Sequence, residues 1–159
     1  MGFALSEMQL SSPSFKAGGS IPKKHTGEGE DVSPALAWSQ APKGTRSFAV
    51  VCHDPDAPLI TRQGTYGFVH WVLYNIPAKV ASLAEGVKDY TEGKSDFGKV
   101  GYGGPMPPNG HGPHRYYFWV LALKEETKLQ PGLGMGDLLA KVEPITAGMN
   151  RLVGTYERS

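Results

Sequence analysis

The sequence predicts a mainly β fold, a two-sheet Greek-key β-sandwich with one or two short helices. The first observation is a set of three nearly continuous apolar runs, residues 48–52, 68–76 and 116–123, each of strand length and rich in aromatic or β-branched residues. Such runs are typical of strands buried on both faces. The second observation is the presence of 21 glycines and 13 prolines among 159 residues, which predicts long ordered loops.

The N-terminal part contributes shorter elements. Residues 3–10 alternate apolar with small or polar side chains and slip once in phase, which predicts a first strand that is at an edge or half-buried and contains a bulge. Residues 16–31 are rich in glycine, proline and charge and are expected to form a long loop. Residues 33–38 are expected to begin a short strand once Pro34 has been passed.

The C-terminal part holds the best helical pattern, residues 134–142. Asp137 near its start suits the positive end of the helix dipole, and Leu138 and Val142 share a face. Residues 152–156 are expected to form a final strand. A parallel α/β sheet would need many more helical patterns than this one, so the β-sandwich is favoured.

Composition limits the function. The length fits one domain, residues 1–159, and the net charge is +1 with 16 basic and 15 acidic residues interspersed. No basic stripe indicates a nucleic-acid partner, no segment approaches the ~18 apolar residues of a membrane span, and no signal peptide is recognised at the N-terminus. We therefore expect a cytoplasmic protein.

Cys52 is the only cysteine, so no intrachain disulfide can form. It lies within an apolar run and is expected to be a small buried hydrophobe. A catalytic thiol would need an activating neighbour, and the adjacent His53 points to the other face of a strand.

An acidic turn, Asp54-Pro55-Asp56-Ala57-Pro58, directly follows the first buried run. The two prolines fix φ and remove two donors, so the acids are held in a stiff turn that suits ligand recognition. The alternative is that Asp54 and Asp56 only cap the turn by accepting hydrogen bonds from nearby backbone N–H groups.

Two histidines lie in or beside the other buried runs. His70 interrupts the run of residues 68–76, where alternation places it on one face with Phe68, Val72 and Tyr74. It is either a hydrogen-bonded core histidine or a ligand-binding one.

His114 and Tyr116 share a face at the start of the third run, where His114 suits a pocket rim. The alternative for His114 is a solvated residue at the start of a strand. His25, His53 and His111 are expected to be surface or loop residues without a role.

Backbone amides and one ion pair complete the predicted site. Glycines such as Gly103 and Gly104 allow backbone N–H groups to approach an anion closely. Arg115 points to the face opposite His114 and is expected to form a structural ion pair with Asp54 or Asp56, which would tie the two clusters together. Two imidazoles, a tyrosine hydroxyl and backbone amides would suit a phosphate or carboxylate oxygen.

At these residues the chain resembles the phosphatidylethanolamine-binding protein family, also called Raf kinase inhibitor-like proteins. The motif Asp-Pro-Asp-x-Pro stands at residues 54–58, Gly-x-His-Arg stands at residues 112–115, and the intervening histidine is His70. Residues 33–38 and 152–156 are similar to the bacterial and archaeal branch. The resemblance covers nearly the whole chain.

The resemblance implies a two-sheet β fold with a small anion pocket. The pocket residues that it implies are Asp54, His70, Gly104, His114 and Tyr116. Asp56, Pro58 and Arg115 are implied as the supporting frame. Met106 stands where mammalian members have a second loop glycine, so Gly104 is the matching position. The chain is also expected to lack the C-terminal helix of mammalian members, because it stops soon after Tyr156.

The leading functional hypothesis is a non-enzymatic binding module for phosphate, phosphoryl or carboxylate groups, such as a phospholipid head group or a phosphorylated ligand, without a cofactor or a resident metal. The alternative is a metal-dependent enzyme that uses Asp54, His70 and His114 as a two-His, one-carboxylate site. A third hypothesis, which the resemblance permits, is inhibition of a kinase or serine protease through exposed loops such as residues 59–66. A homodimer is compatible with each of them.

Overall fold

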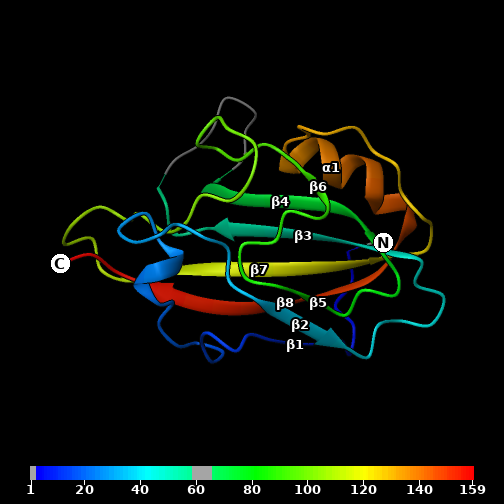
Figure 1. Ribbon diagram of the computed structural model, residues 1–159, viewed down its shortest axis with the longest axis horizontal. Coiled ribbons are helices and arrows are strands. Elements are labelled where there is room, and N and C mark those ends of the chain that lie inside the picture. Colours follow the sequence, from blue (N-terminus) through cyan, green and yellow to red (C-terminus); the bar gives the residue numbers. More distant parts are fainter. Residues whose placement is uncertain (1–2, 59–65) are drawn as a thin grey trace.

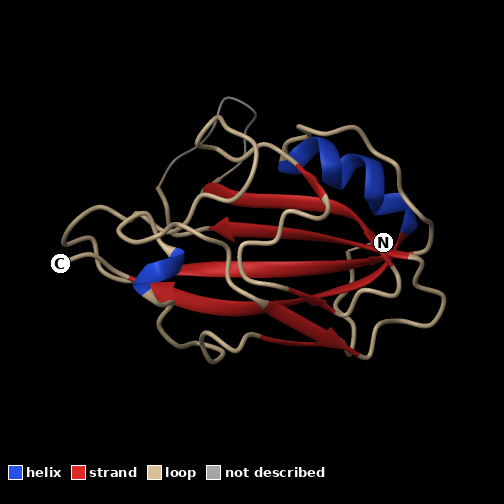
Figure 2. Ribbon diagram, viewed as in Figure 1, coloured by secondary structure: helices blue, strands red, loops and turns tan. Residues whose placement is uncertain are grey.

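The computed structural model describes residues 3–58 and 66–159, and it contains two antiparallel β-sheets (Figures 1 and 2). The five-stranded sheet has the order β6-β4-β3-β7-β8 and the three-stranded sheet has the order β1-β2-β5. The strands are β1 Gln9–Ser11, β2 Leu36–Ser39, β3 Ser47–Asp54, β4 Phe68–Pro77, β5 Ser82–Leu83, β6 Thr91–Glu92, β7 His114–Leu123 and β8 Thr146–Tyr156. The helical segments are α1 Met135–Val142 and two 3-10 turns, Lys23–His25 and Glu143–Ile145. The predicted mainly β, two-sheet fold is confirmed.

The three apolar runs form the centre of the larger sheet, because β3 pairs with β4 on one side and with β7 on the other. Alternate residues of β3 belong to two different clusters: Phe48, Val50 and Cys52 face the smaller sheet, whereas Ala49 and Val51 face α1. Both faces of the central strands are therefore covered, which is why these runs are nearly continuous in apolar residues.

The helix α1 packs on the outer face of the larger sheet (Figure 2). Leu138 and Val142 are its buried residues, as expected for positions one turn apart on one face. They close the outer core together with Val72 and Tyr74 of β4.

Several predicted boundaries were wrong. The first strand covers only Gln9–Ser11, and Leu5 forms an isolated bridge with Met149 rather than part of a continuous strand. The final strand begins at Thr146, well before residue 152, and the short strands β5 and β6 were missed. These two strands have only two residues each, too few for periodicity to reveal.

Candidate functional site

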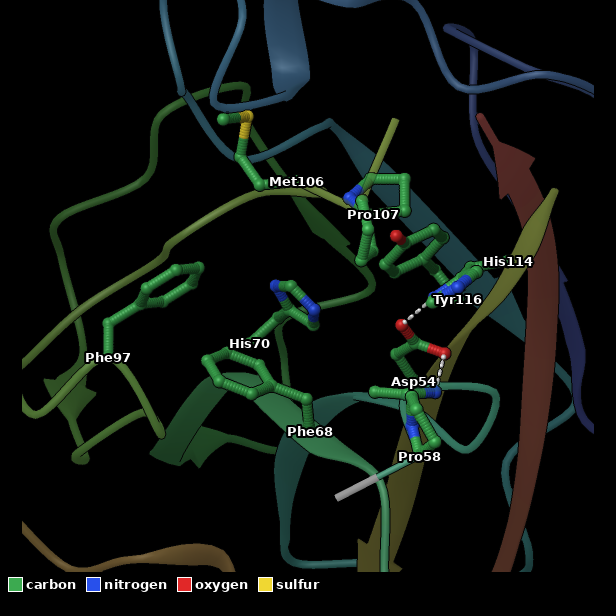
Figure 3. A pocket seen from close by; sticks show the side chains of 11 residues that line it. Asp54, Pro58, Phe68, His70, Phe97, Met106, Pro107, His114 and Tyr116 are labelled. Carbon is green, nitrogen blue, oxygen red and sulfur yellow. Dashed lines mark hydrogen bonds and ion pairs between the residues drawn. The ribbon is translucent and has the colours of Figure 1, made fainter. Parts of the chain in front are cut away.

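A cavity of ≈ 270 Å³ opens at one end of the larger sheet, where β3 ends and β4 and β7 begin (Figure 3). Four polar side chains line it: Asp54, His70, His114 and Tyr116. The other lining residues are apolar: Ala57, Pro58, Phe68, Phe97, Met106, Pro107 and Pro108.

Antiparallel pairing explains why these distant residues meet. Asp54 is the last residue of β3 and pairs with Phe68, the first residue of β4. The first residue of β7 is His114, which follows the Gly/Pro-rich loop and lies beside the same end of β3. The end of β3 and the starts of its two neighbours, β4 and β7, therefore lie at the same end of the sheet.

A β-bulge in β4 directs His70 into the cavity. Cys52 pairs with Trp71 and His53 pairs with Val69, so His70 is an extra residue without a partner on β3. The predicted common face of His70 with Val72 and Tyr74 was wrong, because those two residues face α1 while His70 lines the cavity. A bulge shifts the alternation of side chains between the two faces of a strand by one residue. His70 therefore does not point to the face that packs on α1.

Asp54 is buried and uses both carboxylate oxygens. Oδ1 accepts the backbone N–H groups of Asp56 at 2.8 Å and Ala57 at 3.2 Å, so the residue does cap the proline turn. Oδ2 accepts a hydrogen bond from Nδ1 of His114 at 2.7 Å (Figure 3). Asp54 therefore caps the turn and at the same time belongs to the polar cluster of the cavity.

His114 is buried, so its predicted alternative as a solvated residue was wrong. Its Nε2 lies 2.7 Å from Nδ1 of His111, which forms a chain Asp54–His114–His111 that leads from the turn toward the loop. His111 is an exposed loop residue, as expected, and the structure adds its contact with His114. No motif singles it out, because its contact depends on the path of the Gly/Pro-rich loop.

His70 is buried, and its Nδ1 lies 2.7 Å from the carbonyl oxygen of Gly103. Burial lowers the pKa of His70, while the Gly103 carbonyl and the charge of Asp54 act in the opposite direction. The free ring is therefore neutral at pH 7.

Tyr116 places its ring edge-on to His70, with the ring centroids 5.2 Å apart. Burial, and next the Asp54 carboxylate, raise the pKa of Tyr116 well above its ordinary value. The hydroxyl group therefore stays protonated and can donate a hydrogen bond to a ligand.

Aromatic rings form the wall on the other side of His70 (Figure 3). The ring centroids of Phe68 and Phe97 lie 4.9 and 5.5 Å from the His70 ring and 4.7 Å from each other. Tilted and edge-on packing of this kind fixes ring orientations. His70 therefore separates an apolar half of the cavity from the polar half that holds Asp54, His114 and Tyr116.

The predicted ion pair of Arg115 is confirmed, with Asp56 as its partner. Nε of Arg115 lies 2.9 Å from Oδ2 and Nη2 lies 2.8 Å from Oδ1, and the backbone N–H of Arg115 also donates to Oδ2. Hydrogen bonds from Arg115 lower the pKa of Asp56. Because the Arg115 side chain is 57% exposed, the pair stabilises the fold less than a buried one would.

Gly104 does not line the cavity. Its N–H donates to Oδ1 of Asp31 at 2.7 Å, so the loop amide that the resemblance implied for an anion is used inside the protein. His25 was expected to be a surface or loop residue. It lies in a 3-10 turn within the predicted loop but is buried, and its Nδ1 donates to the carbonyl oxygen of Val32. His53 is half-buried at the loop edge, beside the Tyr66 carbonyl.

The metal alternative finds no support in the described ranges. Within residues 3–58 and 66–159, no group of three or more His, Cys, Asp or Glu side chains is arranged to hold a metal ion. The loop of residues 59–66, expected to contact a partner protein, lies outside the described residues apart from Tyr66.

The sequence and the fold correspond to a known family. The family model described as phosphatidylethanolamine-binding protein matches residues 11–157. The chain belongs to the phosphatidylethanolamine-binding protein family.

Its relatives lie in the bacterial and archaeal branch. A UPF0098 protein of Aquifex aeolicus is 42% identical over 95% of this chain and 89% of its own length. A UPF0098 protein of Methanothermobacter thermautotrophicus is 37% identical over 95% of this chain and 99% of its own length.

Solved structures agree with this placement. YbcL of Escherichia coli is described as a new member of the mammalian phosphatidylethanolamine-binding protein family. It is 33% identical with a TM-score of 0.87, over 97% of this chain and 100% of that one. A carboxypeptidase Y inhibitor, solved with its cognate proteinase, has 20% identity and a TM-score of 0.55 over 96% of this chain and 83% of that one. The second likeness concerns the fold alone.

No helix within the described residues is long and apolar enough to cross a membrane.

Proposed function

We propose that this protein is a non-enzymatic binding module whose cavity holds a small oxyanion: phosphate, a phosphoryl group or a carboxylate, either free or as part of a phospholipid head group. The observation that carries the proposal is the meeting of Asp54, His70, His114 and Tyr116 in one cavity with otherwise apolar walls. Few oriented polar groups in an apolar cavity are typical of small-ligand sites.

The polar half supports recognition of an oxygen ligand. The Tyr116 hydroxyl is a donor, and the imidazoles offer further donors when they are protonated. Asp54 is held by two turn amides and by His114, so little side-chain ordering remains to be lost on binding. The wall formed by Phe68 and Phe97 suits the apolar remainder of a larger ligand.

Binding rather than catalysis is supported by the surroundings of the reactive groups. Cys52 is buried in the core, where burial raises the pKa of its thiol well above the ordinary value, so it is not a thiolate nucleophile. The raised pKa of Tyr116 likewise disfavours a phenolate. Its hydroxyl is better suited to binding than to attack.

The proposal is tested by NMR titration of the ¹⁵N-labelled protein with inorganic phosphate and, separately, with phosphoethanolamine. We expect saturable shifts at His70, His114 and Tyr116. The matched pair of variants is Tyr116→Phe and Tyr117→Phe, because Tyr117 lies on the opposite face and stacks on Trp119.

Loss of the Tyr116 hydroxyl should weaken binding about threefold to tenfold, the range of one neutral hydrogen bond, while Tyr117→Phe should leave it unchanged. Absence of any shift at millimolar ligand would contradict the proposal. So would equal effects of the two variants.

Inhibition of a kinase or a serine protease stays a separate prediction. The carboxypeptidase Y inhibitor is a proteinase inhibitor by its name, but its likeness to this chain is one of fold, and one fold hosts different functions. A panel of proteases and kinases assayed with the purified protein tests this prediction, and inactivity across the panel would leave the binding function alone.

A further inference from the structure

The two buried imidazoles of the cavity both direct Nδ1 at a fixed protein acceptor. Nδ1 of His70 lies 2.7 Å from the carbonyl oxygen of Gly103, and Nδ1 of His114 lies 2.7 Å from Oδ2 of Asp54. Carbonyl and carboxylate oxygens only accept hydrogen bonds, so Nδ1 carries the proton in both rings. Nε2 is then the nitrogen left for other groups, and in a neutral ring it is an acceptor.

The two Nε2 atoms have different surroundings. Nε2 of His114 already lies 2.7 Å from Nδ1 of His111. For Nε2 of His70, residues 3–58 and 66–159 provide no hydrogen-bond partner, although the ring lines the cavity between the aromatic wall and Asp54 (Figure 3). An incoming oxygen atom would therefore meet His70 at Nε2.

The charge in the cavity is unfavourable to an anion when His70 is neutral. The described residues that line the cavity include no lysine or arginine, and Asp54 is the acid among them. An oxyanion would face a lone pair on Nε2 and a carboxylate nearby, with the Tyr116 hydroxyl as a donor. One proton on Nε2 turns the lone pair into a donor and offsets the ligand charge.

We infer that the cavity takes up one proton with each oxyanion and holds this proton between the ligand oxygen and Nε2 of His70. The inference rests on the proposed function and adds the protonation state in which the ligand is held. A monoanionic phosphate group brings the proton as its own P–OH. For a carboxylate, the buffer supplies the proton, which is added to Nε2. Transfer of the P–OH proton to Nε2 leaves a phosphate oxygen as the acceptor, so both ligands end in an N–H···O contact.

Several titratable groups from neighbouring elements act on His70. They are Asp54 and His53 of β3, His114 and Tyr116 of β7, and Asp31 of the N-terminal loop. Burial lowers the pKa of His70 most, His53 also lowers it, and the two acids raise it. The free ring is therefore neutral at pH 7, and the charge of the ligand favours its protonated form.

Acetate is the sharpest probe, because it stays ionised from about pH 6.5 to about pH 8.5 while the proton must come from the buffer. The free protein has to gain a proton in order to bind, so affinity falls as pH rises. We expect the Kd of acetate to increase as pH rises across this interval, by up to about tenfold per pH unit where one full proton is taken up. Calorimetry in buffers with different ionisation enthalpies should give an uptake near one proton per ligand.

Variants and spectroscopy assign the proton to His70. In His70→Gln the side-chain amide presents a donor near the position of Nε2 that does not titrate, so proton uptake should vanish and Kd should become independent of pH. The control is Tyr117→Phe on the opposite face of β7, which should keep both the proton uptake and the pH dependence. In the wild-type protein, ¹⁵N NMR of the histidine rings should show Nε2 of His70 changing from unprotonated to protonated when acetate is added.

Three results would overturn the inference. Saturable acetate binding without proton uptake, and with Nε2 of His70 unprotonated, overturns it and leaves the proposed function intact. Uptake that persists in His70→Gln but is lost in His111→Gln would place the proton on the His111–His114 pair. Failure of the wild-type protein to bind either acetate or phosphate at any pH would overturn the proposed function together with the inference.

Discussion

The two acids of the proline turn should differ sharply in their contribution to stability. Asp54 is buried and accepts three hydrogen bonds, one from His114 and two from backbone amides of the turn. Asp56 also accepts three hydrogen bonds, but all of them come from the exposed residue Arg115. Substituting Asp54 and Asp56 one at a time therefore compares two acids that accept the same number of hydrogen bonds but differ in burial.

Replacing Asp54 by alanine leaves a buried imidazole N–H and two turn amides, one of them buried, without acceptors. Breaking a buried pair in this way costs about 3 to 5 kcal/mol of unfolding free energy. With a urea m value of about 2 kcal/mol per M, the midpoint of unfolding should fall by about 2 M. Asp56→Ala should cause a clearly smaller shift, because water replaces the acceptor at Arg115.

Urea unfolding at neutral pH, followed by tryptophan fluorescence and by circular dichroism, measures both variants against the wild-type protein. Coincident transitions by the two probes would establish that one free energy describes the unfolding. Equal midpoints for Asp54→Ala and Asp56→Ala would refute the argument that burial, rather than the number of hydrogen bonds, sets the contribution of each acid.

Two further predictions concern a glycine pair and the core cysteine. A Cβ at Gly104 would overlap a backbone carbonyl oxygen of the N-terminal loop, whereas a Cβ at Gly136 of α1 would meet open space. Gly104→Ala should therefore lower the unfolding free energy by about 1 to 3 kcal/mol. Gly136→Ala should raise the unfolding free energy by about 0.5 to 1 kcal/mol. Thermal unfolding measures both variants, and a destabilised Gly136→Ala would count against the argument. Burial keeps the thiol of Cys52 protonated. A thiol reagent should therefore label Cys52 slowly in the folded protein and quickly in urea. Fast labelling of the folded protein would show that β3 is accessible to the reagent.

Local patterns predicted the layered architecture well, because burial on two faces leaves a signal in sequence. The runs at residues 48–52, 68–76 and 116–123 became β3, β4 and β7. The pair Leu138 and Val142 identified the buried face of α1. Short elements carried no such signal, since β5 and β6 are defined by pairing with longer strands.

The polar cluster could be predicted only in part. Asp54, His70, His114 and Tyr116 were expected together, and they line one cavity. The loop amide of Gly104 was expected with them, but Asp31, some 70 positions away in the chain, accepts its hydrogen bond instead. A backbone N–H has the same sequence signature whether it faces a ligand or a carboxylate of the protein, so its partner could not be predicted.

The amino-acid sequence alone determined which strands are buried on both faces and that acids and imidazoles lie at their ends, because local hydrophobicity and turn chemistry depend on neighbouring residues. Only the tertiary structure decided which nitrogen of each imidazole is engaged. The bulge at His70, the carbonyl of Gly103 and the approach of His111 to His114 all arise from pairing between distant segments. The direction of each hydrogen bond depends on neighbours that only the folded chain brings together, so it could not be predicted from the sequence.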